Sequence, residues 1–357
     1  MNFIGVDLHK QFSTVCVMNE NLTVVKRKTL YSIQPDLIVE FFKQHAPFKV
    51  VIEATASYVW FAELLEPLAE KIVLANPKKL RVIAESTKKT DRLDAQVLAE
   101  FLARDMIPEA HMPTPRQRQH RILVRQRQYI RSRVTGVKTK IRRILSDYNA
   151  DRKNLFSIDC GPAYTKQVSL NDADRFVIGQ LWSEYMEHSE RLAKVVEKIR
   201  KFAAKAPRRE AEARKILKTA PGVGFVTAEV VLSELGDVSR FRNAKAVCAY
   251  AGLVPAVRQS GGKKSHDLHI TKEGSGLLRW ALVESAWRLV GSDSKWSTTF
   301  MRLKKRSGAR RAIVAIARKL LCVLYAMLKT STPYKIMPTE AKTPKIKRLK
   351  LVKTSTT

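Results

Sequence analysis

The chain has 357 residues, of which 66 are Lys or Arg and 33 are Asp or Glu, giving a formal net charge of +33 at pH 7. No stretch reaches the roughly 18 apolar residues of a membrane-spanning helix, and Met1-Asn2-Phe3-Ile4 enters a strand without a charged leader, so we expect a cytoplasmic protein with no membrane partner. Such an excess of charge repels itself in a compact state unless a polyanion neutralises it, which favours a nucleic-acid partner over a merely solvated basic surface.

Strand and helix signals alternate along the first hundred residues. In chain order, the predicted elements are strands at 3–7, 13–18 and 22–30, a helix at 35–45, a strand at 49–53, a helix at 57–70, a strand at 71–75 and an amphipathic helix at 91–104. Three prolines, Pro108, Pro113 and Pro115, then interrupt the pattern. This order predicts an α/β domain over residues 1–115.

Two long runs with apolar residues at heptad spacing follow, within residues 116–210. The first seam contains Leu123, Ile130, Val134, Val137, Ile141, Ile144 and Tyr148, interrupted by Arg127; the second contains Ile178, Leu181, Tyr185, His188, Leu192, Val195, Ile199 and Phe202. The runs predict two long helices that form a coiled-coil hairpin or a dimerisation arm. His188 lies on the second seam, where we expect a buried polar residue that sets the register and no catalytic role.

After residue 210 the pattern changes to short helices and Gly-containing turns, which predicts a mainly α-helical domain over residues 211–330. Residues 331–357 are rich in Lys, Thr and Pro and are expected to form a disordered tail. The tail either adds charge that contacts nucleic acid or only keeps the chain in solution, and the sequence leaves both open.

Four carboxylates fall where a two-metal nuclease would place them. Asp7 lies on the first strand, Glu53 ends a later strand, and Asp91 and Asp94 share one face of a helix. In a ribonuclease-H-like sheet the first two strands are neighbours, so the four side chains would hold two Mg²⁺ ions that activate the attacking oxygen and neutralise the leaving oxygen. Singly, Asp91 is as well explained as a helix N-cap and Asp94 as a first-turn residue, but the ordered set on a basic chain favours the metal site.

Two later segments have residues suited to phosphate. Gly222 and Gly224 form a helix-hairpin-helix-like turn whose backbone N–H groups would approach a phosphate, although a simple Pro-Gly turn between core helices explains them too. Arg258, Lys263 and Lys264 surround Ser260-Gly261-Gly262 in a loop and suit a phosphate backbone. From the motif alone, Ser260 is more simply a loop residue than a nucleophile.

In these segments the chain resembles the DEDD-type insertion-sequence transposases, which join a RuvC-like domain to a C-terminal transposase domain. The segments that carry the resemblance are Ile4-Gly5-Val6-Asp7, Val51-Ile52-Glu53-Ala54-Thr55, Lys89-Thr90-Asp91-Arg92-Leu93-Asp94-Ala95, Pro221-Gly222-Val223-Gly224, Ser260-Gly261-Gly262, Ile270-Thr271-Lys272-Glu273-Gly274 and Leu278-Arg279-Trp280-Ala281-Leu282. They span nearly the whole chain in the family's order. The basic tail after Ser331 has no counterpart among these motifs.

The resemblance implies a RuvC-like, ribonuclease-H-like fold and a transposase in which Asp7, Glu53, Asp91 and Asp94 bind Mg²⁺. It also implies that Ser260 attacks DNA through a covalent phosphoserine, so that strands rejoin without ATP. The implied partners are the DNA of the element ends and target, a noncoding bridge RNA that selects sites by base pairing, and further copies of the chain. These copies would form a dimer or tetramer with an active site shared between protomers.

Two other functions remain open at this stage. A RuvC-like structure-specific endonuclease would use the same carboxylates with water as the nucleophile, leaving Ser260 a loop residue. A nucleic-acid-binding protein without catalysis would need neither the metal ions nor the serine.

Overall fold

The computed structural model describes residues 1–54, 57–83, 91–157, 161–256, 259–260, 263–264 and 269–334; for 81–83, 91–93, 259–260 and 263–264 only the backbone is described. The chain divides into two compact units, Met1–Pro113 and a second unit that begins at Thr114. In the described ranges, no helix combines the length and the apolar character needed to cross a membrane.

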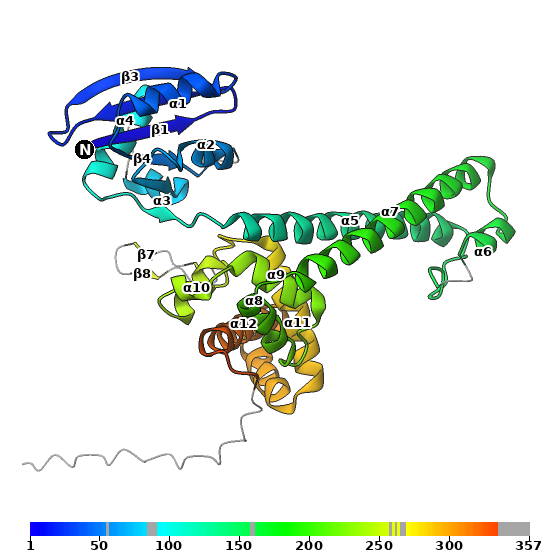
Figure 1. Cartoon of the computed structure of the whole chain (residues 1–357). Helices are drawn as coiled ribbons and strands as arrows, with labels where there is room; N and C mark the ends of the chain where they lie inside the picture. Colours follow the sequence, from blue (N-terminus) through cyan, green and yellow to red (C-terminus); the bar gives the residue numbers. More distant parts are fainter. Residues whose placement is uncertain are drawn as a thin grey trace, which may run out of the picture. The chain divides into compact units, whose positions relative to one another are not determined.

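The first unit is built on a six-stranded mixed sheet with the order β3-β2-β1-β4-β5-β6 (Figure 1). Its strands are β1 (Asn2–Leu8), β2 (Phe12–Met18), β3 (Val24–Tyr31), β4 (Phe48–Glu53), β5 (Lys71–Ala75) and β6 (Glu109–Ala110). β1, β2 and β3 form an antiparallel meander, whereas β4 pairs in parallel with both β1 and β5. The predicted α/β character of this region is confirmed.

Helices cover both faces of this sheet. They are α1 (Pro35–Lys43), α2 (Tyr58–Leu65), α3 (Pro77–Ile83) and α4 (Asp91–Ala103). Because side chains alternate along a strand, Ile4 and Val6 of β1 enter the core that α1 and α2 cover with Phe42 and Phe61. The opposite face packs against α4 through smaller clusters, one of which includes Leu98.

Gly5 lets β1 pass directly beneath α4. A Cβ atom on Gly5 would lie 2.1 Å from the carbonyl oxygen of Ala95 and 2.5 Å from the amide nitrogen of Ala99, both of them main-chain atoms. Only glycine permits so close an approach of two backbones. Main-chain contact therefore sets the spacing between β1, which carries Asp7, and α4, which carries Asp94.

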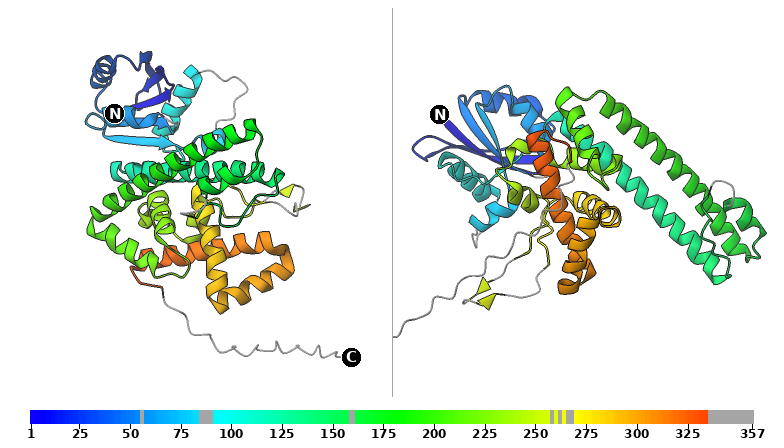
Figure 2. Two further views of the ribbon diagram at one scale, coloured as in Figure 1. Left: turned by 90° about the vertical axis from the view of Figure 1, so that its right-hand side faces the viewer. Right: turned by 90° about the horizontal axis from the view of Figure 1, so that it is seen from below.

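The second unit is helical. Its elements are α5 (Pro115–Asp147), α6 (Gly161–Gln167), α7 (Asp172–Ala204), α8 (Arg208–Lys218), α9 (Phe225–Leu235), a 3₁₀ helix (Val238–Arg240), α10 (Ala244–Tyr250), the short strands β7 (Gln259–Ser260) and β8 (Lys263–Lys264), α11 (Gly276–Ser292) and α12 (Ser294–Thr330). α5 and α7 lie side by side as a long hairpin that projects from the other helices (Figures 1 and 2). The predicted helical character of the region is confirmed.

The hairpin's buried residues differ in part from the predicted heptad seams. On α5 they include Val124 and Leu145, whereas the predicted Leu123 and Ile144 are only half-buried. On α7, Ile178, Leu181, Trp182 and Ile199 are buried, and the remaining seam residues from Tyr185 to Phe202 are half-buried. His188 lies at the half-buried middle, with Nε2 3.3 Å from a carboxylate oxygen of Glu184. Coiled-coil packing of the hairpin stays a prediction.

A buried ionic network joins the base of the hairpin to α8 and α9. The Glu229 carboxylate on α9, only 1% exposed, lies 2.9 Å from Nε2 of His120 and accepts from Nε of Arg214 at 2.6 Å. Arg214 also donates one bond to Glu210, which accepts two more from Arg116. Burial by itself would raise the pKa of Glu229, but the bonds from His120 and Arg214 outweigh it and lower that pKa. Glu229 therefore stays ionised inside the core.

Replacing Arg214 with methionine is expected to destabilise the second unit by about 3–5 kcal/mol, because it leaves the Glu229 carboxylate buried without its main partner. Urea unfolding followed by tryptophan fluorescence measures this change. The control is Arg209→Met, which removes a guanidinium that is 81% exposed and paired with Asp237 at the surface. We expect little change there, and an equal effect of the two substitutions would contradict the importance of the buried network.

Candidate functional site

Asp7 and Glu53 lie level with each other at one edge of the sheet. In the parallel pairing of β1 with β4, Phe3 is opposite Lys49 and Val6 is opposite Ile52. The next residues along the two strands are Asp7 and Glu53. Asp7 is 7% exposed and Glu53 is half-buried. Ends of adjacent parallel strands form a recurrent position for active sites in α/β sheets.

α4 packs on the same face of β1 as Asp7, with contacts at Ala95 and Ala99. Gly5 faces Ala95 of α4, and because side chains alternate along a strand, Asp7 points to the same face two residues later. Asp94 directly precedes Ala95 and is half-buried. Asp91 is the first residue of α4, one turn before Ala95, but its side chain lies outside the described residues.

The donor chemistry of this edge fits a hard divalent cation. Carboxylate oxygens are the ligands that Mg²⁺ prefers, and the sheet and α4 supply them from Asp7, Glu53 and Asp94. Among the described side chains, no three Asp, Glu, His or Cys residues lie close enough together to hold a metal ion. Asp7, Glu53 and Asp94 are therefore not clustered by themselves, and the full set of four ligands, which includes the undescribed side chain of Asp91, stays a prediction.

His9 belongs to this edge and was missed by the sequence reasoning. Its Nε2 lies 3.2 Å from a carboxylate oxygen of Asp7, and its ring lies 4.6 Å from the ring of Phe12. An imidazole at this distance orients the carboxylate. The available signal was the spacing Asp-x-His at the end of a strand, which places both side chains on one face.

Ser260 lies in a small β-hairpin. In the antiparallel pair formed by β7 and β8, Gln259 is opposite Lys264 and Ser260 is opposite Lys263. Only the backbone of these four residues is described, and the predicted phosphate ligand Arg258 lies outside the described residues. The pairing places Lys263, one of the two lysines predicted to bind phosphate, opposite Ser260 in the hairpin.

The hairpin stands on a paired stem, and we call residues 252–274 the Ser260 arm. Pro255 forms an antiparallel bridge with Ile270, and the amide of Ala256 donates to the carbonyl of His269 at 2.9 Å. One step closer to the base, the amide of Thr271 donates to the Val254 carbonyl at 2.9 Å. These bonds hold the two sides of the arm together below Ser260.

Glycines permit the tight backbone at the base of the arm. Gly252 has φ +67° and Gly274 has φ +133°, conformations that side chains disfavour. A Cβ atom on Gly274 would also lie 2.0 Å from the carbonyl oxygen of Tyr250. The end of the arm therefore packs directly against the backbone at the end of α10.

Arg279 joins the two ends of the arm. From the first turns of α11, its Nη1 donates to the carbonyl of Ala251 at 3.2 Å and to the carbonyl of Gly274 at 2.9 Å. The first carbonyl precedes the arm and the second ends it. One guanidinium thus fixes both sides of the base, and sequence reasoning missed this role because the two carbonyls are distant from each other along the chain.

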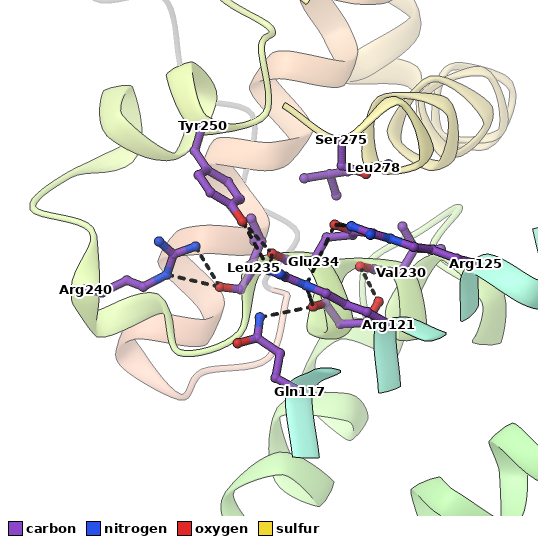
Figure 3. Close-up of polar contacts among 11 residues, drawn as sticks. Gln117, Arg121, Arg125, Val230, Glu234, Leu235, Arg240, Tyr250, Ser275 and Leu278 are labelled. Atoms are coloured by element: carbon purple, nitrogen blue, oxygen red, sulfur yellow. Dashed lines mark hydrogen bonds and ion pairs between the residues drawn. The ribbon is translucent and has the colours of Figure 1, made fainter. Parts of the chain in front are cut away.

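The end of α10 is in turn fixed to α5 and α9 (Figure 3). Arg121 donates to the carbonyls of Ser233 and Glu234 at 2.8 and 2.9 Å and to the Tyr250 hydroxyl at 3.2 Å. Tyr250 donates its hydroxyl proton to the Glu234 carbonyl at 3.1 Å. The last carbonyls of a helix have no partner within it, so these side chains satisfy the end of α9.

The same corner contains a buried carboxylate. The Glu234 side chain is 2% exposed and accepts from Nε and Nη2 of Arg125 at 3.0 and 3.1 Å. This hydrogen bonding raises the pKa of Arg125. Arg240 stacks over the Tyr250 ring at 4.5 Å and donates to the Leu235 carbonyl (Figure 3). The base of the Ser260 arm therefore rests on a packed and hydrogen-bonded support.

The two glycines of the predicted phosphate-binding turn differ in their surroundings. Gly222 has φ +76°, and a Cβ atom there would lie 2.6 Å from the Ser285 carbonyl oxygen of α11, so packing within the chain already requires glycine. Gly224 is the N-cap of α9, and a Cβ atom there would meet nothing within 4 Å among the described residues. Phosphate contact at either glycine stays a prediction.

Comparison with known proteins adds two matched domains. Residues 4–150 match a transposase family of the DEDD, IS110 type, and residues 214–302 match the family described as "Transposase IS116/IS110/IS902 family". The first match includes all four predicted carboxylates, and the second includes Ser260.

Curated relatives match along most of the chain. The chain is 26% identical to the transposase for insertion sequence element IS1111A of Coxiella burnetii over 94% of its own length and 92% of that protein. It is 25% identical to the pilin gene-inverting protein of Moraxella lacunata over 93% and 97%. It is 26% identical to the transposase for insertion sequence element IS1328 of Yersinia enterocolitica over 80% and 83%. The similarity therefore includes both units.

Proposed function

We propose that this chain, which belongs to the IS110-type family of insertion-sequence transposases, is a Mg²⁺-dependent DNA recombinase. It would use Ser260 as its nucleophile and a noncoding bridge RNA as its guide. The observation that carries the proposal is the register that places Asp7 level with Glu53, with α4 packed on the same face of β1 as Asp7. Carboxylates in this arrangement support metal-assisted chemistry on phosphodiesters.

In the proposed reaction the Ser260 hydroxyl attacks a DNA phosphorus atom. A bond forms between the serine oxygen and phosphorus, the bond to one strand breaks, and that strand leaves as a hydroxyl after taking a proton. A strand hydroxyl later attacks the phosphoserine and releases Ser260, so the number of phosphoester bonds is conserved. Asp7, Glu53, Asp91 and Asp94 would hold the divalent ions, which would stabilise charge on the attacking and leaving oxygens.

The proposed site draws on both units. The carboxylates belong to the first unit and Ser260 to the second, so we propose that subunits of a dimer or tetramer complete the site between them. Coiled-coil packing of α5 and α7 would form the contact between copies. Lys263 and Lys264, with Arg258 and the N-terminus of α9 at Gly224, would bind the DNA backbone. Base pairing to the RNA would choose the sequence, and the protein would contact the backbone.

The test is a search for a covalent protein–DNA adduct. Purified full-length protein is incubated with Mg²⁺, the noncoding RNA of its own element and labelled DNA carrying the element junction, then separated under denaturing conditions. We expect an adduct that requires both the RNA and the metal. Free cut ends without an adduct would support a water-using endonuclease, and adduct formation without the RNA would contradict the guide.

Removing the Arg279 guanidinium is expected to slow adduct formation by roughly 10- to 100-fold at saturating DNA. Without it the base of the Ser260 arm is less fixed, and a displacement of about 1 Å at a reacting group lowers the rate by up to this factor. The Arg279→Ala variant should bind DNA normally, and Arg279→Lys should recover part of the rate by donating to one of the two carbonyls. The control is Arg288→Ala, an exposed arginine of the same helix. A loss of DNA affinity equal to the loss of rate would show that Arg279 does not position the arm.

A further inference from the structure

The exposed side of α5 is a long cationic surface. Among the exposed residues of α5, ten share one side of the helix, and we call them the α5 strip: Ile122, Arg125, Gln126, Tyr129, Ser132, Arg133, Gly136, Thr139, Lys140 and Arg143. Their spacing of three, four and seven residues places them on one side of the helix. Residues 110–146 contain nine arginines and two lysines but no Asp or Glu. No carboxylate of this segment therefore offsets the charge.

Among the described residues, carboxylates pair with the α5 strip only near its two ends. Arg125 pairs with Glu234, and Arg143 pairs with Asp147 at 3.0 Å. In the middle, Arg133 lies over the Tyr129 ring at 5.1 Å and donates to its hydroxyl, which orders the guanidinium and leaves its charge in place. Within the described ranges no carboxylate pairs with Lys140. The centre of the strip is therefore both ordered and cationic.

The neighbouring helix of the same hairpin has the opposite arrangement. On α7, Glu190 pairs with Lys194 and Glu197 pairs with Lys201, both at 2.6 Å and four residues apart, and Glu187 pairs with Arg191. An ordinary solvated helix face is laced with such pairs. The two helices have equal length, but these surface cations of α7 are paired with carboxylates, whereas among the described residues those at the centre of the α5 strip are not. Solvation alone therefore does not explain the charge of α5.

Gly136 supplies an observation independent of charge. It lies in the middle of α5, where glycine costs about 1 kcal/mol relative to alanine. A Cβ atom on Gly136 would meet nothing within 4 Å among the described residues, so packing within the chain does not require glycine. A bare patch of helix backbone between Arg133 and Lys140 suits close approach by a second molecule.

We propose that the α5 strip binds the backbone of duplex DNA. From Ile122 to Arg143 the helix rises about 32 Å, close to the roughly 34 Å of one turn of B-form DNA. Arginine, lysine and small side chains fit a phosphate backbone. The α5 strip includes neither the four carboxylates nor Ser260, so the proposal does not depend on how strands are cut.

Other occupants fit less well. Unpaired bases need several exposed aromatic side chains for stacking, and the strip has only Tyr129, already covered by Arg133. A helix can contact the backbone from within the major groove of B-form DNA, which admits a helix, but not from within that of A-form RNA, which is deep and narrow. A second copy of α5 would bring Arg133, Lys140 and Arg143 against the same cations, with no carboxylate on the strip to offset them.

The test measures binding of full-length protein to a labelled duplex of roughly 30 base pairs and arbitrary sequence, without RNA, across a range of salt concentrations. For the double variant Arg133→Gln/Lys140→Gln we expect about tenfold weaker binding and a salt slope smaller by about two. The matched control, Lys194→Gln/Lys201→Gln, removes the same charge from α7, at side chains 72% and 70% exposed. It should change the affinity less than twofold.

An equal loss of affinity in the two double variants would show that net charge alone acts, and would overturn the proposal. A selective loss of structured-RNA binding would assign the strip to RNA instead. Dissociation of an oligomer by Arg133→Gln/Lys140→Gln, with unchanged DNA affinity per subunit, would assign it to a second copy. Each result is read from the same samples by titration and by sedimentation.

Gly136→Ala tests the close approach without changing charge. It should raise the melting temperature, because alanine favours helix, yet weaken duplex binding several-fold. Gly179→Ala is the control, since Gly179 is an exposed glycine of α7 where a Cβ atom also meets nothing within 4 Å in the described structure. It should stabilise without affecting binding. Unchanged affinity of Gly136→Ala would exclude backbone approach at this position.

Discussion

Ser260→Ala is expected to abolish the covalent protein–DNA adduct and to lower strand exchange by roughly 10⁴-fold or more, the usual consequence of removing a nucleophile. The hairpin backbone should persist, because the bonds of the stem and the base do not involve the Ser260 side chain. DNA and RNA affinity should therefore change little. Denaturing electrophoresis of the adduct and sequencing of the exchanged strands measure the two effects.

The control for this experiment is Ser265→Ala, which removes a hydroxyl five residues further along the sequence. It should leave both readouts near wild type. If the Ser260→Ala variant still hydrolyses DNA with Mg²⁺ at the wild-type rate, the serine mechanism is contradicted. The protein would then act as a nuclease that uses water as its nucleophile. Loss of all cleavage would exclude that nuclease, because its nucleophile does not come from the protein.

Asp7→Asn is expected to reduce Mg²⁺-dependent cleavage by about 10³-fold or more while leaving nucleic-acid binding in place. The substitution keeps the size of a side chain that is only 7% exposed but removes the negative charge that a divalent ion needs. Cleavage assays across a Mg²⁺ titration, with binding measured in parallel, separate the two effects. If the metal site is formed as proposed, high Mg²⁺ should restore little activity.

Asp36→Asn is the matched control, since Asp36 is an exposed carboxylate in the first turn of α1. Its cleavage rate should match wild type. Equal activity of Asp7→Asn and wild type would remove Asp7 from the site. Absence of any Mg²⁺-dependent cleavage in the wild-type protein, with its DNA and RNA present, would favour a binding protein without catalysis.

The sequence allowed prediction of features that depend on local pattern. Alternating apolar residues located β1 and β4, and the order of the carboxylates led to Asp7 and Glu53, which the sheet register places side by side. Heptad spacing located both helices of the hairpin but misplaced part of the seam, with Val124 and Leu145 buried in place of Leu123 and Ile144. Adjacent apolar residues on a helix compete for the buried side, and tertiary packing decides between them.

Contacts between distant residues were beyond sequence reasoning. Glu229 and His120 are 109 residues apart, and the two carbonyls that Arg279 joins lie on opposite sides of the Ser260 arm. Gly222 shows a related limit. The sequence indicated close approach of a backbone to this glycine, and the structure finds one within the chain, against Ser285. A glycine pattern alone does not say which molecule approaches.

The contact of Gly5 with α4 bears on how this site tolerates sequence drift. Because the gap between β1 and α4 is set by main-chain atoms at Ala95 and Ala99, exchange of larger side chains elsewhere in the core does not alter it directly. The distance between the two elements that carry Asp7 and Asp94 therefore does not depend directly on how the surrounding core side chains pack. An edge of the sheet whose spacing depends on glycine can keep its dimensions while much of the surrounding sequence changes.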